Sequence, residues 1–241
     1  MDLSAHQPLT GVRVIEIGTS VAAPYAAWIL GNLGADVVKV ERPGPGDDSR
    51  QWGRMFPDGS SSYFNALNRD KRGITVNLSV EEEREWLRGF CVNEVDVVLQ
   101  NMRPGKLESY GLGGDKLIKA NSRLIYCNLG AFGRCGPLKD RPGYDPLMQA
   151  YGGIMSITGE DGRPPIRVGT SIVDMGTGLW CAVGILAAMR RLSETGKGCV
   201  VDASLYETAV GWMTNSVAST GVDGRNPERE GSGARGKAPY Q

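Results

Sequence analysis

Residues 12–40, VRVIEIGTSVAAPYAAWILGNLGADVVKV, decide the fold of this chain. The stretch begins with a short apolar run that Gly18 breaks, which predicts a buried strand. Residues 24–33 predict a helix with proline in its first turn, where the missing N–H costs little, and Gly34 suits the end of that helix. Residues 36–40 predict a second strand. A strand, a helix and a strand in about 30 residues are typical of a βαβ unit, which implies a parallel sheet with a right-handed crossover.

The same alternation continues along the chain. Further strands are expected at residues 73–78, 95–100, 124–129 and 199–203, and the clearest helices at residues 80–91, 146 onward and 178–192. Strands that alternate with helices in this way predict an α/β fold, a Rossmann-like doubly wound parallel sheet.

The composition changes near the C-terminus. After Ser219 the sequence TGVDGRNPEREGSGARGKAPYQ is rich in Gly, Arg and Pro and has little potential to form a core. We therefore predict one large domain over residues 1–210, followed at 211–241 by a linker and the incomplete start of a second, smaller domain.

Composition and charge exclude several functions. Apolar residues make up 41% and charged residues 22%, and 27 basic residues balance 27 acidic ones, so nothing favours a nucleic acid or an anionic membrane as partner. The apolar run at residues 179–189 is shorter than the roughly 20 residues that span a bilayer, and no signal peptide is evident. The five cysteines are scattered and odd in number, which favours a reduced, cytoplasmic protein over a disulfide framework.

The only histidine, His6, lies near the N-terminus. This makes histidine-based metal sites, Ser-His-Asp triads and Cys-His dyads unavailable. Any chemistry must then depend on carboxylates, lysines, hydroxyls, thiols or backbone dipoles, and no metal site is expected.

The most informative acid is Asp174, within TSIVDMGTG at residues 170–178. An extended stretch is expected to end at Asp174, just before the long apolar helix, where the helix dipole favours the ionised carboxylate. One interpretation is a plain N-cap. The other is a functional acid, because Gly176 and Gly178 leave room for a large substrate to approach closely.

Two other segments carry candidate residues. In RPGYDPLMQAYGG, residues 141–153, Tyr144 and Asp145 either shape and cap a turn or face the same pocket as Asp174. The loop after the first strand has only the first glycine of a dinucleotide fingerprint, so a nicotinamide site is disfavoured. Beyond the second strand, Glu41 and Arg42 form a solvated pair, or Arg42 binds a phosphate or adenine at the carboxyl end of the sheet.

Together these segments resemble the class III coenzyme A transferases, the group of formyl-CoA transferase and carnitine CoA-transferase. The resemblance covers residues 9–207. It rests on seven segments in order: LTGVRVIEIG, AAPYAAWILGNLGADVVKVERPGPGDDSR, FNALNRDKRGITVNL, LQNMRPGKLESYGL, GPLKDRPGYDPLMQAYGG, VDMGTGLWCAVGILAAM and TGKGCVVDASLYE.

The resemblance implies that Asp174 is the nucleophile that transfers coenzyme A from an acyl-CoA to a small carboxylic acid, through aspartyl anhydrides and an aspartyl-CoA thioester. A carboxylate needs no general base, which suits a chain without a usable histidine. Backbone N–H groups at the start of the helix are expected to stabilise the oxyanion. The resemblance also implies that a coenzyme A thioester is the substrate, and no tightly bound cofactor is expected.

The implied coenzyme A contacts are Ser20, Val21, Arg42, residues 76–79 (Val76 to Ser79), Asn101, Met102, Ser109 and Arg141. Arg42 would lie at the adenine end. Some relatives carry a lysine or arginine at the positions of Ser79 and Ser109, and serine cannot supply that charge to a phosphate.

Two alternatives remain open from the sequence. A racemase of 2-methylacyl-CoA pairs a histidine with an aspartate, whereas this chain has Tyr144 beside Asp145, and a phenol with a pKa near 10 is a poor substitute. The other alternative is a non-catalytic CoA-binding subunit or fragment. The resemblance also implies an interlocked homodimer about four hundred residues long per chain, so 241 residues alone are expected to be inactive or poorly soluble.

Overall fold

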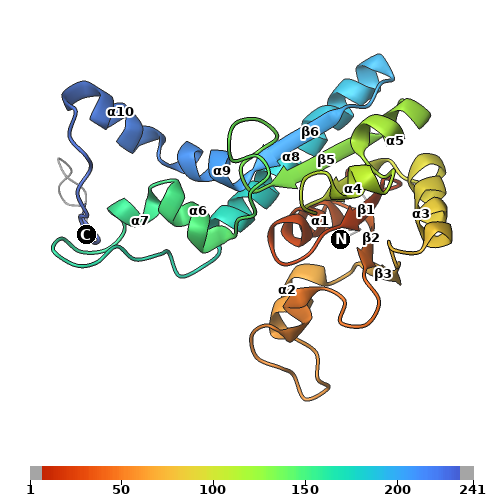
Figure 1. Ribbon diagram of the computed structural model, residues 1–241, viewed down its shortest axis with the longest axis horizontal. Helices are drawn as coiled ribbons and strands as arrows, with labels where there is room; N and C mark the ends of the chain where they lie inside the picture. Colours follow the sequence, from red (N-terminus) through yellow and green to blue (C-terminus); the bar gives the residue numbers. More distant parts are fainter. Residues whose placement is uncertain (1–6, 234–241) are drawn as a thin grey trace.

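The computed structural model describes residues 7–233 and shows a six-stranded, all-parallel sheet in the order β3-β2-β1-β4-β5-β6. This confirms the predicted doubly wound α/β fold (Figure 1). His6 and residues 234–241, with the chain end at Gln241, lie outside the described residues. The strands are β1 (Arg13–Ile17), β2 (Asp36–Glu41), β3 (Arg72–Thr75), β4 (Val97–Gln100), β5 (Ile125–Gly130) and β6 (Val200–Ser204).

Alternating side chains of the strands supply two apolar layers, one on each face of the sheet. Along β5, Ile125 and Cys127 enter one cluster, whereas Tyr126 enters the other. The first layer is covered by α1 (Ala22–Asn32), α8 (Ile172–Thr195) and α9 (Leu205–Trp212). The second is covered by α3 (Glu81–Asn93), α4 (Lys106–Ser109) and α5 (Gly114–Ala120).

The strand order creates a switch point between β1 and β4, which pair in parallel although they are not consecutive. Chain leaving β1 turns toward β2, and chain leaving β4 turns toward β5. Open α/β sheets bind ligands in the crevice that this divergence leaves at the carboxyl ends of the strands. The loops that begin at Gly18 and Asn101 lie at this position.

Helix α8 differs from the prediction at its start. It begins at Ile172, so Asp174 lies inside its first turn and is neither the end of an extended stretch nor the N-cap, which is Ser171. Gly176 and Gly178 lie within this helix, and their missing side chains make room for neighbouring elements, not for the substrate that the sequence suggested. A Cβ at Gly176 would lie 2.7 Å from the Trp212 ring, and one at Gly178 would lie 2.6 Å from the Ala22 carbonyl oxygen.

With 24 residues, α8 is long and apolar enough to cross a membrane by length and composition. The apolar run at residues 179–189, which is too short to do so, is only part of this helix. It is nevertheless a central helix of this fold. Its buried side chains include Cys181 and Ile185, which lie in the same apolar cluster as strands β1, β4 and β5.

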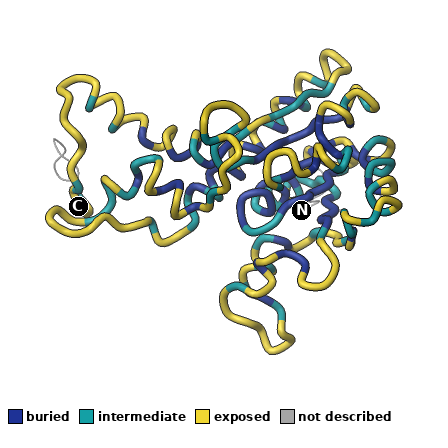
Figure 2. Tube along the Cα trace, in the orientation of Figure 1, coloured by how far each residue is buried: buried dark blue, intermediate teal, exposed yellow. Residues whose placement is uncertain are grey.

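An arm extends from the sheet, drawn at the left of Figure 1. It contains α6 (Asp145–Tyr151), α7 (Ile154–Ile157) and α10 (Thr214–Asp223). The last of these has no buried residue, and the arm is largely exposed in Figure 2. The proposed domain boundary after residue 210 falls within α9, and the division itself stays a prediction. Below the sheet in the view of Figure 1, the chain after β2 forms a short 3-10 helix, Asp48–Gln51, and α2 (Ser62–Asn68).

Candidate active site

A cavity of about 410 Å³ lies at the carboxyl ends of β1 and β4 and contains Asp174 in its lining. Five of the predicted coenzyme A contacts line the same cavity: Ser20, Val21, Asn101, Met102 and Arg141. The switch point thus brings together residues that are up to 154 positions apart, from Ser20 to Asp174.

A second cavity of about 190 Å³ adjoins the first and contains the predicted adenine end of the site. Arg42, Val76 and Ser79 line it. Thr19, Met102 and Lys106 line both cavities and therefore form their common wall. An elongated ligand that occupied both would place one end at Asp174 and the other at Arg42.

Ser109 is the one predicted contact that lines neither cavity. Its hydroxyl donates to the carbonyl oxygen of Lys106 at 2.8 Å within α4. Lys106 is the residue that the sequence analysis missed, and it supplies a positive charge that Ser79 and Ser109 cannot. The signal was present in NMRPGKLES, where a lysine follows the loop at the end of a buried strand.

Arg42 is half-exposed at the rim of the second cavity, and Glu41 is not its partner. The guanidinium of Arg42 donates to Gly46 O at 3.0 Å and pairs with Asp48. Glu41 instead accepts two hydrogen bonds of 2.7 Å from Arg50. The interpretation of residues 41 and 42 as a solvated pair is therefore wrong, since each charge is satisfied separately.

The first turn of α8 is capped by a side chain from another helix. Asp145, fully buried at the start of α6, accepts hydrogen bonds through Oδ2 from the backbone N–H groups of Val173 at 2.7 Å and Asp174 at 3.1 Å. The remaining first-turn amides also have partners, because Ile172 N–H donates to Thr170 O and Met175 N–H to Ser171 O. These amides cannot hold an oxyanion, so that expectation was wrong.

The adjacent residues Tyr144 and Asp145 have different surroundings. Tyr144 lines the cavity with Asp174 and is 65% exposed. Asp145 lies behind the cavity wall, in contact with the α8 backbone. One interpretation of the sequence was that Asp145 caps its own turn, but in the structure it caps the start of a distant helix, α8.

Asp174 titrates unusually for an aspartate. Burial, and after it the negative charge of Asp145, raises the pKa of Asp174 to about 7. The sequence predicted the opposite direction from the helix dipole, whose amides here already bind Asp145. A carboxyl group with a strongly shifted pKa that lies in a cavity is common at catalytic sites.

The strand order and the paired cavities define the class of this protein: a Rossmann-type α/β protein with two adjoining cavities at its switch point. A family model described as CoA-transferase family III matches residues 9–241, and the chain belongs to that family.

Similar proteins agree with this assignment. The chain is 37% identical to the succinyl-CoA:glutarate CoA-transferase of Mus musculus over 100% of its own length, and 38% identical to the succinate–glutarate CoA-transferase of Agrobacterium fabrum over 97%. It covers 55% and 60% of those proteins, so it spans little more than half of their length. A crystal structure of a CAIB/BAIF family protein from Brucella suis matches with a TM-score of 0.92 and 40% identity, over 98% of this chain and 63% of that one.

Proposed function

We propose that this chain carries the nucleophile and the coenzyme A site of a CoA-transferase that moves coenzyme A between an acyl-CoA and a carboxylic acid. The observation that supports this most is the position of Asp174, a carboxylate of raised pKa in a cavity that continues toward Arg42. Family membership and the relatives named above agree with it.

The proposed chemistry begins with attack of the Asp174 carboxylate on the thioester carbonyl, which breaks the C–S bond and gives a mixed anhydride and CoA thiolate. The thiolate then attacks the aspartyl carbonyl, which releases the donor acid and leaves an aspartyl-CoA thioester. The acceptor carboxylate displaces the thiolate to form a second anhydride. The thiolate then attacks the acyl carbon of this anhydride that comes from the acceptor acid, which frees the new acyl-CoA and regenerates the Asp174 carboxylate.

The oxyanions of these steps need hydrogen-bond donors other than the α8 amides. Helix α1 starts in the wall of the same cavity, at Ala22, and no side chain caps it. We propose that backbone N–H groups at its start, those of Val21 and Ala22, serve this purpose.

The acceptor is proposed to be a small dicarboxylic acid. Two arginines, Arg103 and Arg141, line the cavity that holds Asp174. One carboxylate of the acid would react while the other pairs with a guanidinium, whose planar fork suits carboxylates. Relatives named for succinate and glutarate act on acids of this kind.

Mass spectrometry tests the proposal in the longest natural form of the protein. After incubation with succinyl-CoA, we expect the intact mass to show a CoA adduct that hydroxylamine removes, and digestion to place it on the peptide that contains Asp174. A screen of acyl-CoA donors against carboxylic acids would then identify the pair. Coenzyme A binding without any adduct or exchange would instead support the non-catalytic alternative.

The rate should depend on pH through Asp174. Because its pKa is raised to about 7, the carboxylate is largely protonated below neutrality, and kcat/KM should rise as the pH increases through 7. Asp145→Asn retains an oxygen that can cap α8 but removes a negative charge. The inflection in the pH profile of kcat/KM should therefore move to lower pH. A pH profile that is the same in both proteins would contradict this origin of the shift.

Arg42→Ala should weaken binding more than it slows the chemistry. Arg42 lies in the second cavity, away from Asp174, and offers a planar cation for adenine stacking or phosphate pairing. We expect a KM for the CoA thioester at least several-fold higher with kcat little changed. Steady-state kinetics check this, and a pure kcat defect would refute the placement.

We also propose a cytoplasmic homodimer. Large apolar side chains are exposed on α8 and α9, among them Leu179, Trp180 and Trp212, each at least half exposed. Such patches commonly mark interaction surfaces. Light scattering coupled to size-exclusion chromatography measures the oligomeric state, and a stable monomer would contradict the proposal.

A further inference from the structure

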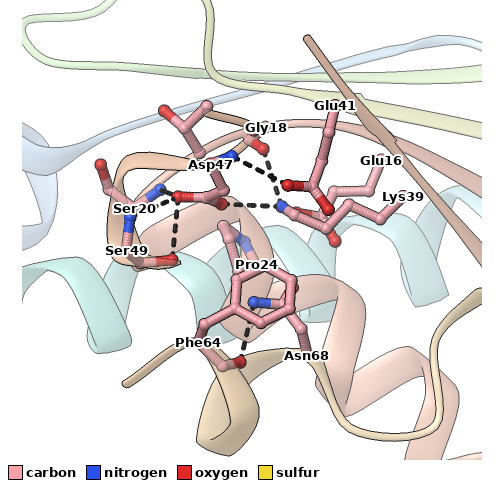
Figure 3. Close-up of polar contacts among 12 residues, drawn as sticks. Glu16, Gly18, Ser20, Pro24, Lys39, Glu41, Asp47, Ser49, Phe64 and Asn68 are labelled. Atoms are coloured by element: carbon pink, nitrogen blue, oxygen red, sulfur yellow. Dashed lines mark hydrogen bonds and ion pairs between the residues drawn. The ribbon is translucent and has the colours of Figure 1, made fainter. Parts of the chain in front are cut away.

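Three side chains hold the backbone of the short loop after β1, residues 18–20. Two of them are shown in Figure 3: Lys39 Nζ donates to Gly18 O at 2.8 Å, and Asp47 Oδ1 accepts from Ser20 N–H at 3.0 Å. Between them, Asn101 accepts from Thr19 N–H at 3.0 Å and donates to Thr19 O at 2.9 Å. Thr19 belongs to the wall between the two cavities, so this loop helps to shape both.

Ser20 is held in an unfavourable conformation. Its φ of 71° makes it one of two non-glycine residues with positive φ in the described part of the chain. A left-handed backbone costs a residue with a Cβ about 1–2 kcal/mol, so contacts elsewhere must maintain it. The carboxylate of Asp47 is itself fixed, because Oδ1 also accepts from the N–H and the hydroxyl of Ser49, each at 2.9 Å.

Asp47 belongs to a buried cluster of two acids and two lysines. Lys39 Nζ lies 2.6 Å from Glu16 Oε1 and 2.9 Å from Asp47 Oδ2, and Lys71 Nζ lies 2.7 Å from Glu16 Oε2. Burial acts against the charged form of Asp47, but Lys39 and the two amides outweigh it and lower the pKa of Asp47. Lys71 makes no hydrogen bond to the loop. It donates to Glu16, Pro24 O and Asn68.

Asp47 also belongs to the turn that carries Arg42. Its backbone N–H donates to Glu41 Oε2 at 2.8 Å, and Arg42 donates to Gly46 O in the same turn. One residue therefore connects the turn at the second cavity with Ser20 at the first.

From this geometry we propose that Asp47 is a positioning residue, which holds Ser20 in its left-handed conformation and thereby gives the coenzyme A site its shape on the side facing Asp174. The inference rests on the proposed function. It predicts that loss of the Asp47 contact releases the loop and weakens the binding of coenzyme A, although Asp47 itself lines only the second cavity.

The test compares Asp47→Ala and the milder Asp47→Asn with Lys71→Met in the longest natural form of the protein. Lys71 is a matched control. Its loss changes the net charge of the same buried cluster by one unit, but it removes no contact with residues 18–20. Amide hydrogen exchange follows residues 19–21, calorimetry gives the Kd of CoA, and thermal unfolding reports stability. We expect Asp47→Ala to raise the Kd at least tenfold and to accelerate exchange at Ser20, with Asp47→Asn between it and the unmodified protein.

Lys71→Met should lower stability comparably but change the Kd less than threefold. A second substitution, Ser20→Gly, should recover part of the lost affinity in the Asp47→Ala background, because glycine adopts positive φ without cost. Equal Kd changes in the Asp47 and Lys71 variants, or unchanged exchange at Ser20, would overturn the inference. If the unmodified protein fails to bind CoA, the proposed function fails, whereas the exchange data still decide whether Asp47 holds the loop.

Discussion

Asp174→Asn should reduce CoA transfer more than a hundredfold, which corresponds to roughly 3 kcal/mol in the activation barrier. The amide has the shape of the carboxylate but is not a nucleophile. The fold should survive, because the contact of this residue with Asp145 is made by its backbone N–H. Removing a buried acid beside another acid also removes a cause of repulsion. Initial rates and the adduct assay measure the loss, with CoA affinity as the check on the site.

A matched control is Asp115→Asn. Asp115 also lies in the first turn of a helix, α5, but it is exposed and lines none of the cavities described above. Its variant should transfer CoA at the normal rate. If freshly prepared Asp174→Asn protein, shown by mass to be free of deamidation, keeps more than a tenth of the rate, Asp174 is not the nucleophile.

Gly178→Ala should lower the free energy of unfolding by about 2–3 kcal/mol, despite the better helix propensity of alanine. The added Cβ would lie 2.6 Å from Ala22 O and 3.1 Å from Ala26 N, both backbone atoms of α1 that cannot turn aside. Helix α1 must then move, and its start forms part of the wall of the Asp174 cavity. CoA affinity should therefore fall together with stability.

Gly89→Ala is the control for this substitution. Gly89 lies in α3, and a Cβ there would meet nothing within 4 Å. Replacing a helical glycine at an unobstructed position should raise the free energy of unfolding by up to about 1 kcal/mol. Urea unfolding measures both changes, and two variants of equal stability would show that the close approach of α1 and α8 is not what requires Gly178.

The first βαβ unit could be predicted almost to the residue because its information is local. The strand expected at 12–17 is β1 (Arg13–Ile17), and the one expected at 36–40 is β2 (Asp36–Glu41). Apolar runs, a proline in the first turn of a helix and a glycine at its end act within a few residues. Asp174 and Arg42 were also candidates from the residues alone, whereas the other proposed contacts came only from the resemblance. All of them except Ser109 line the two cavities.

The start of α8 could not be predicted, because distant residues determine it. Asp145 supplies the cap from another helix. Trp212 and α1 explain the two glycines that, in the sequence, suggested room for a substrate beside Asp174. The buried cluster was missed for the same reason. Lys39 interrupts an apolar strand, but its partners Glu16 and Asp47 come from separate parts of the chain.

The cap that Asp145 places on α8 makes proton binding and helix docking thermodynamically reciprocal. Since the charge of Asp145 helps to raise the pKa of Asp174, each ionisation of Asp174 disfavours the docked position of α6 by the same free energy. Any partner that draws the arm away from α8 would thereby make Asp174 more acidic. The protonation of Asp174 and the docking of α6 against α8 are thus linked through the charge of Asp145.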